Sequence, residues 1–269
     1  MLTIITALIA SLGIFFIGRN FFEMGNGWSL TFAAISYAIF QAGLGYLVQR
    51  KVKRVMDKVQ MILTEGQKKL QQKTQRWQMR PPSSIQAAQK EIAADTKVFV
   101  KEALIATEEL KKFRLFVPMI DRQLASAQFQ LNWMIKEFKV VDKLMPKIML
   151  IDPTMCAMKM ARLYMTGATT EEIKKIFDKS SRRLRYNQNV LLAATMSWIE
   201  VKRGDVDAAF KTLTQALKSS DNETLKRNHT ELMNNRVAHF SNSGVGDQWY
   251  SLYLEEPKIR AQRQVRVYR

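Results

Sequence analysis

Few side chains in this chain of 269 residues are suited to catalysis or metal binding. The two histidines, His229 and His239, lie ten positions apart near one expected helix, a spacing that matches no common metal-ligand pattern. The single cysteine, Cys156, lies among methionine and alanine, where a buried, inert thiol is expected. One cysteine also excludes an internal disulfide and a cysteine-built zinc site. We therefore predict a non-enzymatic protein with no metal and no cofactor.

Two further patterns resemble functional motifs but lack the context that those motifs need. The paired acids Glu108-Glu109 and Glu171-Glu172 fall in helical surface patterns, so we interpret them as solvated charge. The stretch Gly244-Val-Gly246 has no lysine after it and no strand before it, which argues against a phosphate-binding loop.

Positive charge is the main chemical resource of the chain. Its 42 basic and 24 acidic residues give a net charge of +18, which favours an anionic partner such as phospholipid headgroups, nucleic acid or an acidic protein surface. Three basic clusters are, in chain order, Arg50, Lys51, Lys53 and Arg54; Lys174, Lys175, Lys179, Arg182, Arg183 and Arg185; and Lys258, Arg260, Arg263, Arg266 and Arg269. The last cluster either contacts an anionic surface or forms a solvated terminus.

The elements that must position these clusters begin with two uncharged runs. Residues 2–18 and 28–48 contain no charged side chain. The second run has 21 residues, which is about 31 Å as a helix and matches a hydrocarbon core of roughly 30 Å. We predict a transmembrane helical hairpin over residues 1–48. A cleaved signal peptide is the rival, but no basic residue precedes Arg19 and no small-x-small site follows the first run.

The flanking charges predict the orientation of this hairpin. The connecting loop carries Arg19 against Glu23, whereas the chain after Val48 carries a dense basic cluster opposed only by Asp57. Because basic loops stay on the cytoplasmic side, we expect a multi-pass membrane protein with both termini in the cytoplasm, and a bacterial inner membrane as its location.

Small residues predict how the two spanning helices pack. Ala34, Ala38 and Ala42 recur four apart in the second run, and Ala7 and Ser11 have the same spacing in the first. Close backbone approach across small side chains is what packs helices in lipid. Packing within the hairpin is our interpretation, with contact between copies as the alternative. No charged residue lies in mid-membrane, so we do not expect a channel or transporter.

Residues 49–80 continue the helical pattern into a basic juxtamembrane helix that ends at Pro81-Pro82. Its basic residues are either an orientation signal on a solvated face or a contact with anionic lipid, to which only the first turns, up to about Lys58, lie close enough. Its apolar stripe consists of Val52, Val55, Val59, Ile62, Leu63, Leu70 and Trp77.

Residues 83–146 predict a coiled-coil-like helical hairpin. Ser83-Ser84 can cap its first helix, and Pro118 breaks the chain between the two helices. From Ile120 to Met145 apolar residues alternate at spacings of four and three, which is a heptad pattern. An antiparallel pair within one chain is the simplest arrangement, and a coiled-coil dimer between chains is the alternative.

Residues 152–240 predict short helices with well-marked ends. Asp152 with Pro153, Thr169 and Asp205 are typical helix-starting residues, and Gly167 and Gly204 follow predicted helix ends.

The stretch from Trp198 to Leu217 resembles the centre of a tetratricopeptide repeat. That family has Gly-Asp at the turn between two helices, then a small residue five positions after the glycine and another seven further on; Gly204, Ala209 and Ala216 match this spacing. The resemblance implies tetratricopeptide-like α-α repeats over residues 152–240 that bind a partner on their inner helices. By that resemblance Asn187, Trp198 and Lys202 are candidate partner-contact residues.

Residues 241–269 complete the predicted organisation with an aromatic segment and the basic tail. The aromatic segment, around Trp249, is expected to cap the open end of the stack. The sequence thus predicts an all-α protein that serves as a membrane-anchored scaffold or adaptor for a partner protein, with homo-oligomerisation as a further option. The alternatives are a membrane-tethered binder of nucleic acid, ribosome or anionic lipid, and a structural subunit of a membrane complex.

Overall fold

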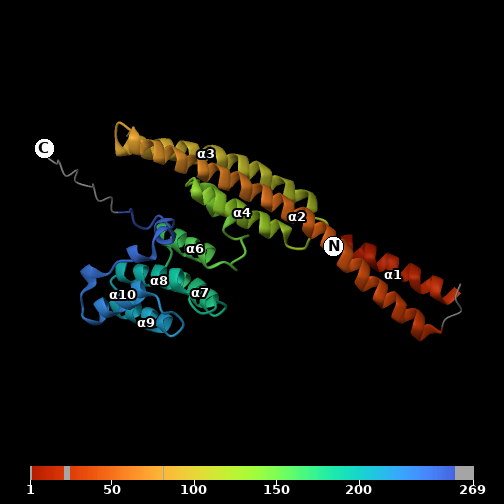
Figure 1. Ribbon diagram of the computed structural model, residues 1–269. Helices are drawn as coiled ribbons and strands as arrows, with labels where there is room; N and C mark the ends of the chain where they lie inside the picture. The colour runs from red at the N-terminus through yellow and green to blue at the C-terminus, as the bar shows by residue number, and fades with distance from the viewer. Residues whose placement is uncertain (1, 21–24, 81, 258–269) are drawn as a thin grey trace. The chain divides into compact units, whose positions relative to one another are not determined.

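The computed structural model describes residues 2–20, 25–80 and 82–257 (Figure 1). Helices dominate this part of the chain and no strand occurs in it, which confirms the predicted all-α class. The fold separates into two compact units, Met1–Met149 and Leu150–Arg269.

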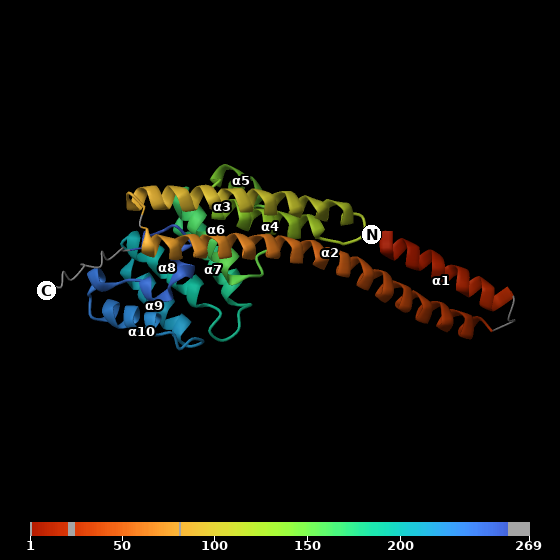
Figure 2. The ribbon, with the colours of Figure 1, turned by 45° about the horizontal axis from the view of Figure 1, so that its top comes forward.

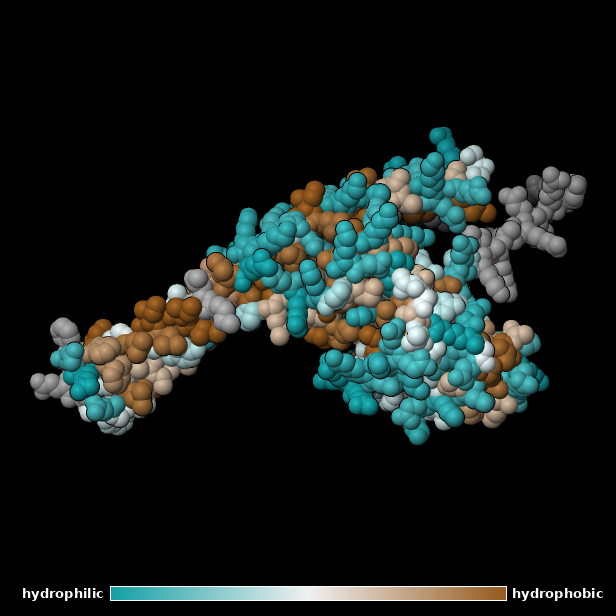
Figure 3. Space-filling view, turned by 180° about the vertical axis from the view of Figure 1, so that it is seen from behind, coloured by the Kyte–Doolittle hydropathy of each residue, from teal (hydrophilic) through white to brown (hydrophobic). Residues whose placement is uncertain are grey.

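The first unit begins with two apolar helices, α1 (Leu2–Asn20) and α2 (Asn26–Met79). By length and composition both are able to cross a membrane, and only 17% and 6% of their most apolar windows are buried in the fold. Large apolar side chains therefore face outward, among them Ile9 at 65% and Ile39 at 66% exposure. Figure 3 shows this apolar surface over the hairpin of α1 and the start of α2. The two helices support an association with membrane.

Small side chains pack α1 against α2, but only half of the predicted set takes part. Ala7 and Ser11 of α1 are buried, as predicted, and their counterparts in α2 are Ser29 and Ala33. The predicted residues Ala34, Ala38 and Ala42 are exposed instead, so their assignment to the packing within the hairpin was wrong. The start of α2 carries two overlapping series of small residues, and α1 packs against the series that contains Ser29 and Ala33.

Helix α2 continues without interruption from the apolar hairpin into the basic segment, as the sequence predicts. Its predicted apolar stripe packs in two clusters. Val59, Ile62, Leu63 and Leu70 share a core with α3 (Ile85–Glu108), whereas Val55 is buried with Leu110, Ile120 and Leu124 further along the chain. Both ribbon views draw α3 alongside the second half of α2 (Figures 1 and 2). Ser84 caps α3 by accepting a hydrogen bond from the Ala87 backbone N–H, as predicted.

The predicted two-helix coiled coil of residues 83–146 is instead part of a three-helix packing. After the short helix η1 (Glu109–Phe113), α4 (Ile120–Met134) lies against α3, and Leu131 joins a core that Val59 of α2 and Val100 of α3 share. The heptad pattern does not give one long helix, because the chain turns at Lys136, whose φ is 57°, before the short α5 (Phe138–Leu144). The pattern identified apolar positions correctly but not the break between them.

The second unit consists of short helices with the predicted capping residues. Its helices are α6 (Pro153–Met165), α7 (Thr170–Ser181), α8 (Val190–Lys202), α9 (Val206–Leu217), α10 (Glu223–Met233) and α11 (Asp247–Tyr250), with η2 (Val237–His239) and η3 (Ser243–Val245) between the last two. Asp152, Thr169 and Asp205 each cap a helix through the side chain, and Thr169 forms a capping box with Glu172. Helix α10 begins at Glu223, and the side chain of Asn222 caps it by accepting hydrogen bonds from the Thr224 and Leu225 backbone N–H groups.

Helix α8 is the centre of this unit, because every residue from Leu191 to Glu200 is buried. Ala209 and Ala216 of α9 are buried at 0% and 3% exposure, in one core cluster with Ala193 of α8 and Leu225 of α10. Gly204 forms the turn between α8 and α9 with a φ of 83°, a conformation that favours glycine. The small residues thus lie where helices approach closely.

Candidate functional site

A basic surface of the second unit follows the outer side of α7, after the exposed Glu171 and Glu172 of its first turn, and the loop after the helix. Ile173 and Ser180 face the core, so Lys174, Lys175 and Lys179 project outward on the opposite side. Arg182, Arg183 and Arg185 extend the same charge into the α7–α8 loop and are also exposed. We call these six residues the basic edge. A rigid, capped helix that presents closely spaced cations is suited to binding carboxylates or phosphates.

Asn187, predicted from the repeat resemblance to contact a partner, instead holds two loops together. Its φ is 61°, its backbone N–H donates to the Ser219 carbonyl at 2.9 Å, and its side-chain oxygen accepts from the Asp221 N–H at 3.0 Å. These bonds fix the α7–α8 loop, which carries part of the basic edge, to the α9–α10 loop. The residue therefore has a structural role, although its side chain is exposed.

Trp198 is not available on an inner surface, as its predicted role would require. It is 5% exposed, and its ring makes edge contacts with Tyr164 and with Trp249 of α11. Its indole N–H donates to Glu255 Oε1 at 2.6 Å, while the indole of Trp249 donates to Oε2 of the same carboxylate at 2.9 Å. The C-terminal segment thus covers Trp198, because one carboxylate joins the two indoles.

Lys202, the third residue predicted from the resemblance, remains exposed at the border of this aromatic cluster. Its ammonium group lies 5.3 Å from the centre of the Trp198 ring. This distance allows a cation–π interaction. Trp198 is buried and Asn187 is bonded into a loop contact. Of the three predicted contact residues, Lys202 is therefore the one whose side chain is exposed and makes no such bond between loops.

Glu200 is a buried carboxyl group that no sequence pattern indicated. It is 1% exposed at the end of α8, and its Oε2 has no hydrogen-bond partner in the described part of the chain. Burial raises its pKa to about 7, although a hydrogen bond from Thr212 and the charge of Lys174 act in the opposite direction. A charged residue near a helix end gives no signal in the sequence that it will be buried.

The juxtamembrane cations lie on exposed positions of α2. Arg50, Lys51, Lys53 and Arg54 are all exposed, and a shallow hollow of about 520 Å³ lies among Tyr46, Gln49, Arg50, Lys53, Arg54 and Asp57. The predicted contacts Arg260, Arg263, Arg266 and Arg269 lie outside the described residues.

Cys156 and His229, which were candidates for chemistry, are held by packing and hydrogen-bond contacts within the fold. Burial raises the pKa of the Cys156 thiol, which keeps it protonated and unreactive at neutral pH. His229 stacks on Phe210 and lies 3.0 Å from the hydroxyl of Thr214. Within residues 2–20, 25–80 and 82–257, no cluster of three or more His, Cys, Asp or Glu side chains could hold a metal ion.

Comparisons with known proteins add no relative to these observations. The chain matches no protein-family model, no curated protein and no solved structure.

Proposed function

We propose that this protein is a membrane-anchored, non-enzymatic adaptor whose second unit docks an acidic partner protein on the basic edge. In this proposal α1 and the start of α2 cross the bilayer twice, and both termini lie in the cytoplasm. The repeat-like α8–α9 pair provides a rigid core, and α7 presents the charge.

The observation that carries the proposal is the position of the basic edge. Six cations on α7 and the following loop are exposed on a unit whose interior is closed by Trp249, Leu252 and Glu255. Because the surface around Trp198 is already covered, the exposed cations offer a better docking surface than the inner helices. Exposed lysines on a capped helix and arginines in the loop that follows it recognise carboxylates without a large conformational change.

The test compares charge-reversal variants of the full-length protein, purified in detergent after mild crosslinking in cells. The combined change Lys174→Glu, Lys175→Glu and Arg182→Glu should remove a specific co-purifying protein. A matched control, Lys211→Glu, Lys218→Glu and Arg236→Glu, reverses three exposed charges elsewhere in the same unit and should retain it. Equal recovery of the partner with both variants would defeat the proposal.

The alternative of nucleic-acid binding uses the same cations and is tested separately. The purified protein is titrated with a single-stranded RNA and with an acidic peptide at several salt concentrations. Binding of RNA that weakens steeply with salt, together with loss of the co-purifying partner after nuclease treatment, would favour the alternative. We rank it lower because Tyr186, 63% exposed beside Arg185, offers a single aromatic side chain at the basic edge, whereas single-strand binders stack successive bases on several aromatic side chains.

A further inference from the structure

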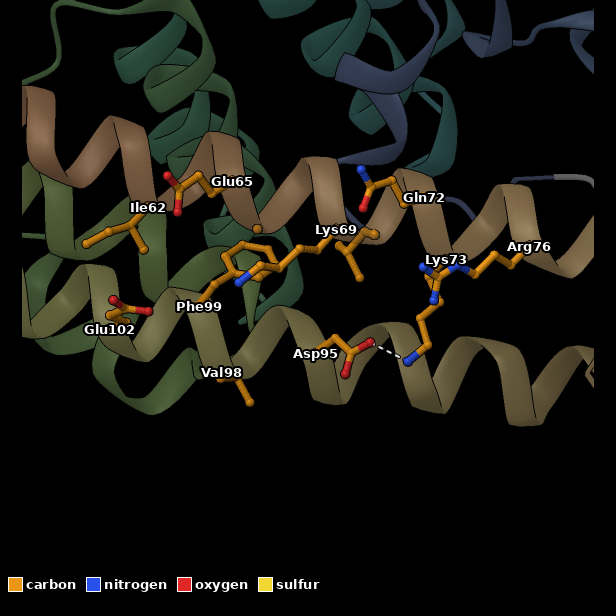
Figure 4. A pocket seen from close by; sticks show the side chains of 12 residues that line it. Ile62, Glu65, Lys69, Gln72, Lys73, Arg76, Asp95, Val98, Phe99 and Glu102 are labelled. Carbon is orange, nitrogen blue, oxygen red and sulfur yellow. Dashed lines mark hydrogen bonds and ion pairs between the residues drawn. The ribbon is translucent and has the colours of Figure 1, made fainter.

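A groove runs between α2 and α3 in the first unit, and no other helix contributes to its lining. Its volume is about 440 Å³ (Figure 4). The floor includes Gly66 and Phe99, whose ring reaches from α3 toward α2 beside Lys69. Helix α4 packs on the same pair of helices through Leu131, yet it contributes nothing to the groove.

The two rims of the groove carry complementary charge. On the α2 rim, the side chains of Lys69 and Arg76 form no ion pair or hydrogen bond within the described part of the chain. On the α3 side, Asp95 of the lining and Glu91, one turn away on the same helix, share a single cation, Lys73 of α2, which lies 2.5 Å from each carboxylate. The α2 rim therefore has unpaired positive charge, and the α3 rim has more carboxylate than Lys73 neutralises.

The α3 side of the groove also exposes apolar side chains. Val98, in the lining, is 69% exposed, and Ile105, two helical turns further along, is 73% exposed. These two side chains extend the charged rim with apolar surface that a packing partner would bury.

We propose that this groove is the contact surface for a second copy of the same chain. The proposal rests on the membrane anchoring proposed above, because two copies in one bilayer must have parallel anchors. A symmetric pair then has its twofold axis along the bilayer normal. When that axis runs along the groove, α2 of each copy faces α3 of the other in a four-helix arrangement.

The twofold axis also determines which residues meet. Rotation about this axis leaves the position of each residue along the bilayer normal unchanged. Residues of α2 and α3 that are level within one chain, such as Gly66 with Phe99 and Lys73 with Asp95, are therefore also level between the two copies. In this register Arg76 faces the partner's Glu91, and Ile62 faces the partner's Ile105. Lys69 lies level with the partner's Val98, one helical turn from the partner's Asp95. The contact thus joins cation to carboxylate at one end and apolar side chains at the other.

One contact in this register is unfavourable, and its removal can be tested. Glu65, on the α2 rim, comes to lie opposite the partner's Glu102, and neither has a partner within its own described chain. Two carboxylates that face each other across the contact repel and oppose association. Replacing Glu65 by lysine should therefore strengthen the contact, whereas a surface with no partner would be indifferent to the change.

Mixed-tag crosslinking in native membranes tests the register directly. Two differently tagged full-length chains are co-expressed, one carrying Lys69→Cys and the other Val98→Cys, so that only a bond between chains is possible. The native Cys156 is buried and can stay in place. We expect a crosslink between the two tags. The control pair uses Gln71→Cys, an exposed residue of the same helix outside the groove lining, with Val98→Cys. Equal crosslinking of both pairs, or none with Lys69→Cys, would overturn the proposal.

Charge variants provide the second test on the same full-length protein. Glu65→Lys should raise the crosslinked fraction by roughly threefold. Lys69→Glu combined with Arg76→Glu, read out through Ile62→Cys and Ile105→Cys, should lower it by a similar factor. No response to any of these charges would refute the groove as the contact. A protein that stays in the membrane but does not crosslink contradicts only the dimer, whereas a protein outside the membrane contradicts the anchoring itself.

Discussion

The ring of Phe99 in α3 lies directly against the backbone of Gly66 in α2. A Cβ atom at position 66 would come within 2.5 Å of Cδ1 of Phe99, so no side chain fits there without displacement of the ring. Phe99 is 8% exposed and belongs to the core that α2 and α3 share with α4. This glycine leaves the space that the Phe99 ring occupies against α2.

Replacement of this glycine should destabilise the packing of α3 on α2. We expect Gly66→Ala to lower the stability of the first unit by about 1–3 kcal/mol, because overpacking outweighs the roughly 1 kcal/mol that alanine gains in a helix. The rate of proteolysis of the full-length protein in detergent, with identification of the first cleavage sites, reports the loss of stability in the first unit. Gly43→Ala in the same helix is the control, since nothing lies within 4 Å of its added Cβ. Equal protease resistance of both variants would show that the contact is unimportant.

The buried carboxyl of Glu200 should make stability depend on pH. Its pKa is raised from 4.5 to about 7 in the folded state, so the folded protein binds more protons than the unfolded chain between these values. Stability should therefore fall as pH rises from about 4.5 to 7, by up to about 3 kcal/mol, and then level off.

The variant Glu200→Gln tests this dependence. It should remove most of the slope and be more stable than the native protein at pH 8, as measured by the thermal unfolding midpoint at several pH values. Glu171→Gln, at an exposed position of α7, serves as the control and should keep the native slope. A native protein whose midpoint does not change between pH 5 and 8 would contradict the buried environment of Glu200.

The carboxylate of Glu255 should be essential for the attachment of the C-terminal segment. Glu255→Ala leaves the indole N–H groups of Trp198 and Trp249 without their acceptor, at a cost of roughly 2–3 kcal/mol. We expect a lower unfolding midpoint and a change in tryptophan fluorescence. The neighbouring exposed Glu256→Ala should behave like the native protein. If the two variants are indistinguishable, the segment does not cover Trp198 in solution.

Local signals in the sequence predicted many element boundaries. Ser84, Asp152, Thr169 and Asp205 act as caps because a short polar side chain can satisfy the free N–H groups of a helix start, whatever its tertiary surroundings. The continuity of α2 across Val48 was also predictable, since its helical periodicity does not change there.

The choice of packing partner was not predictable in the same way. An apolar stripe shows which face of α3 is buried but not that α2 and α4 both lie on it. The burial of Trp198 depends on contacts with Trp249 and Glu255, more than 50 residues away, and no local pattern reports such a contact. The basic edge was predictable because a run of charged residues is exposed whatever its distant contacts. The roles of Asn187 and Glu200 depend on such contacts and were not predictable.

We propose that the first 48 residues cross a membrane twice and leave the basic chain in the cytoplasm. This topology is tested by protease treatment of intact and permeabilised cells that express the protein with a C-terminal epitope. We expect the epitope to survive in intact cells, to sediment with carbonate-washed membranes, and to be lost after permeabilisation. Loss of the epitope in intact cells, or its release by carbonate, would rule this topology out.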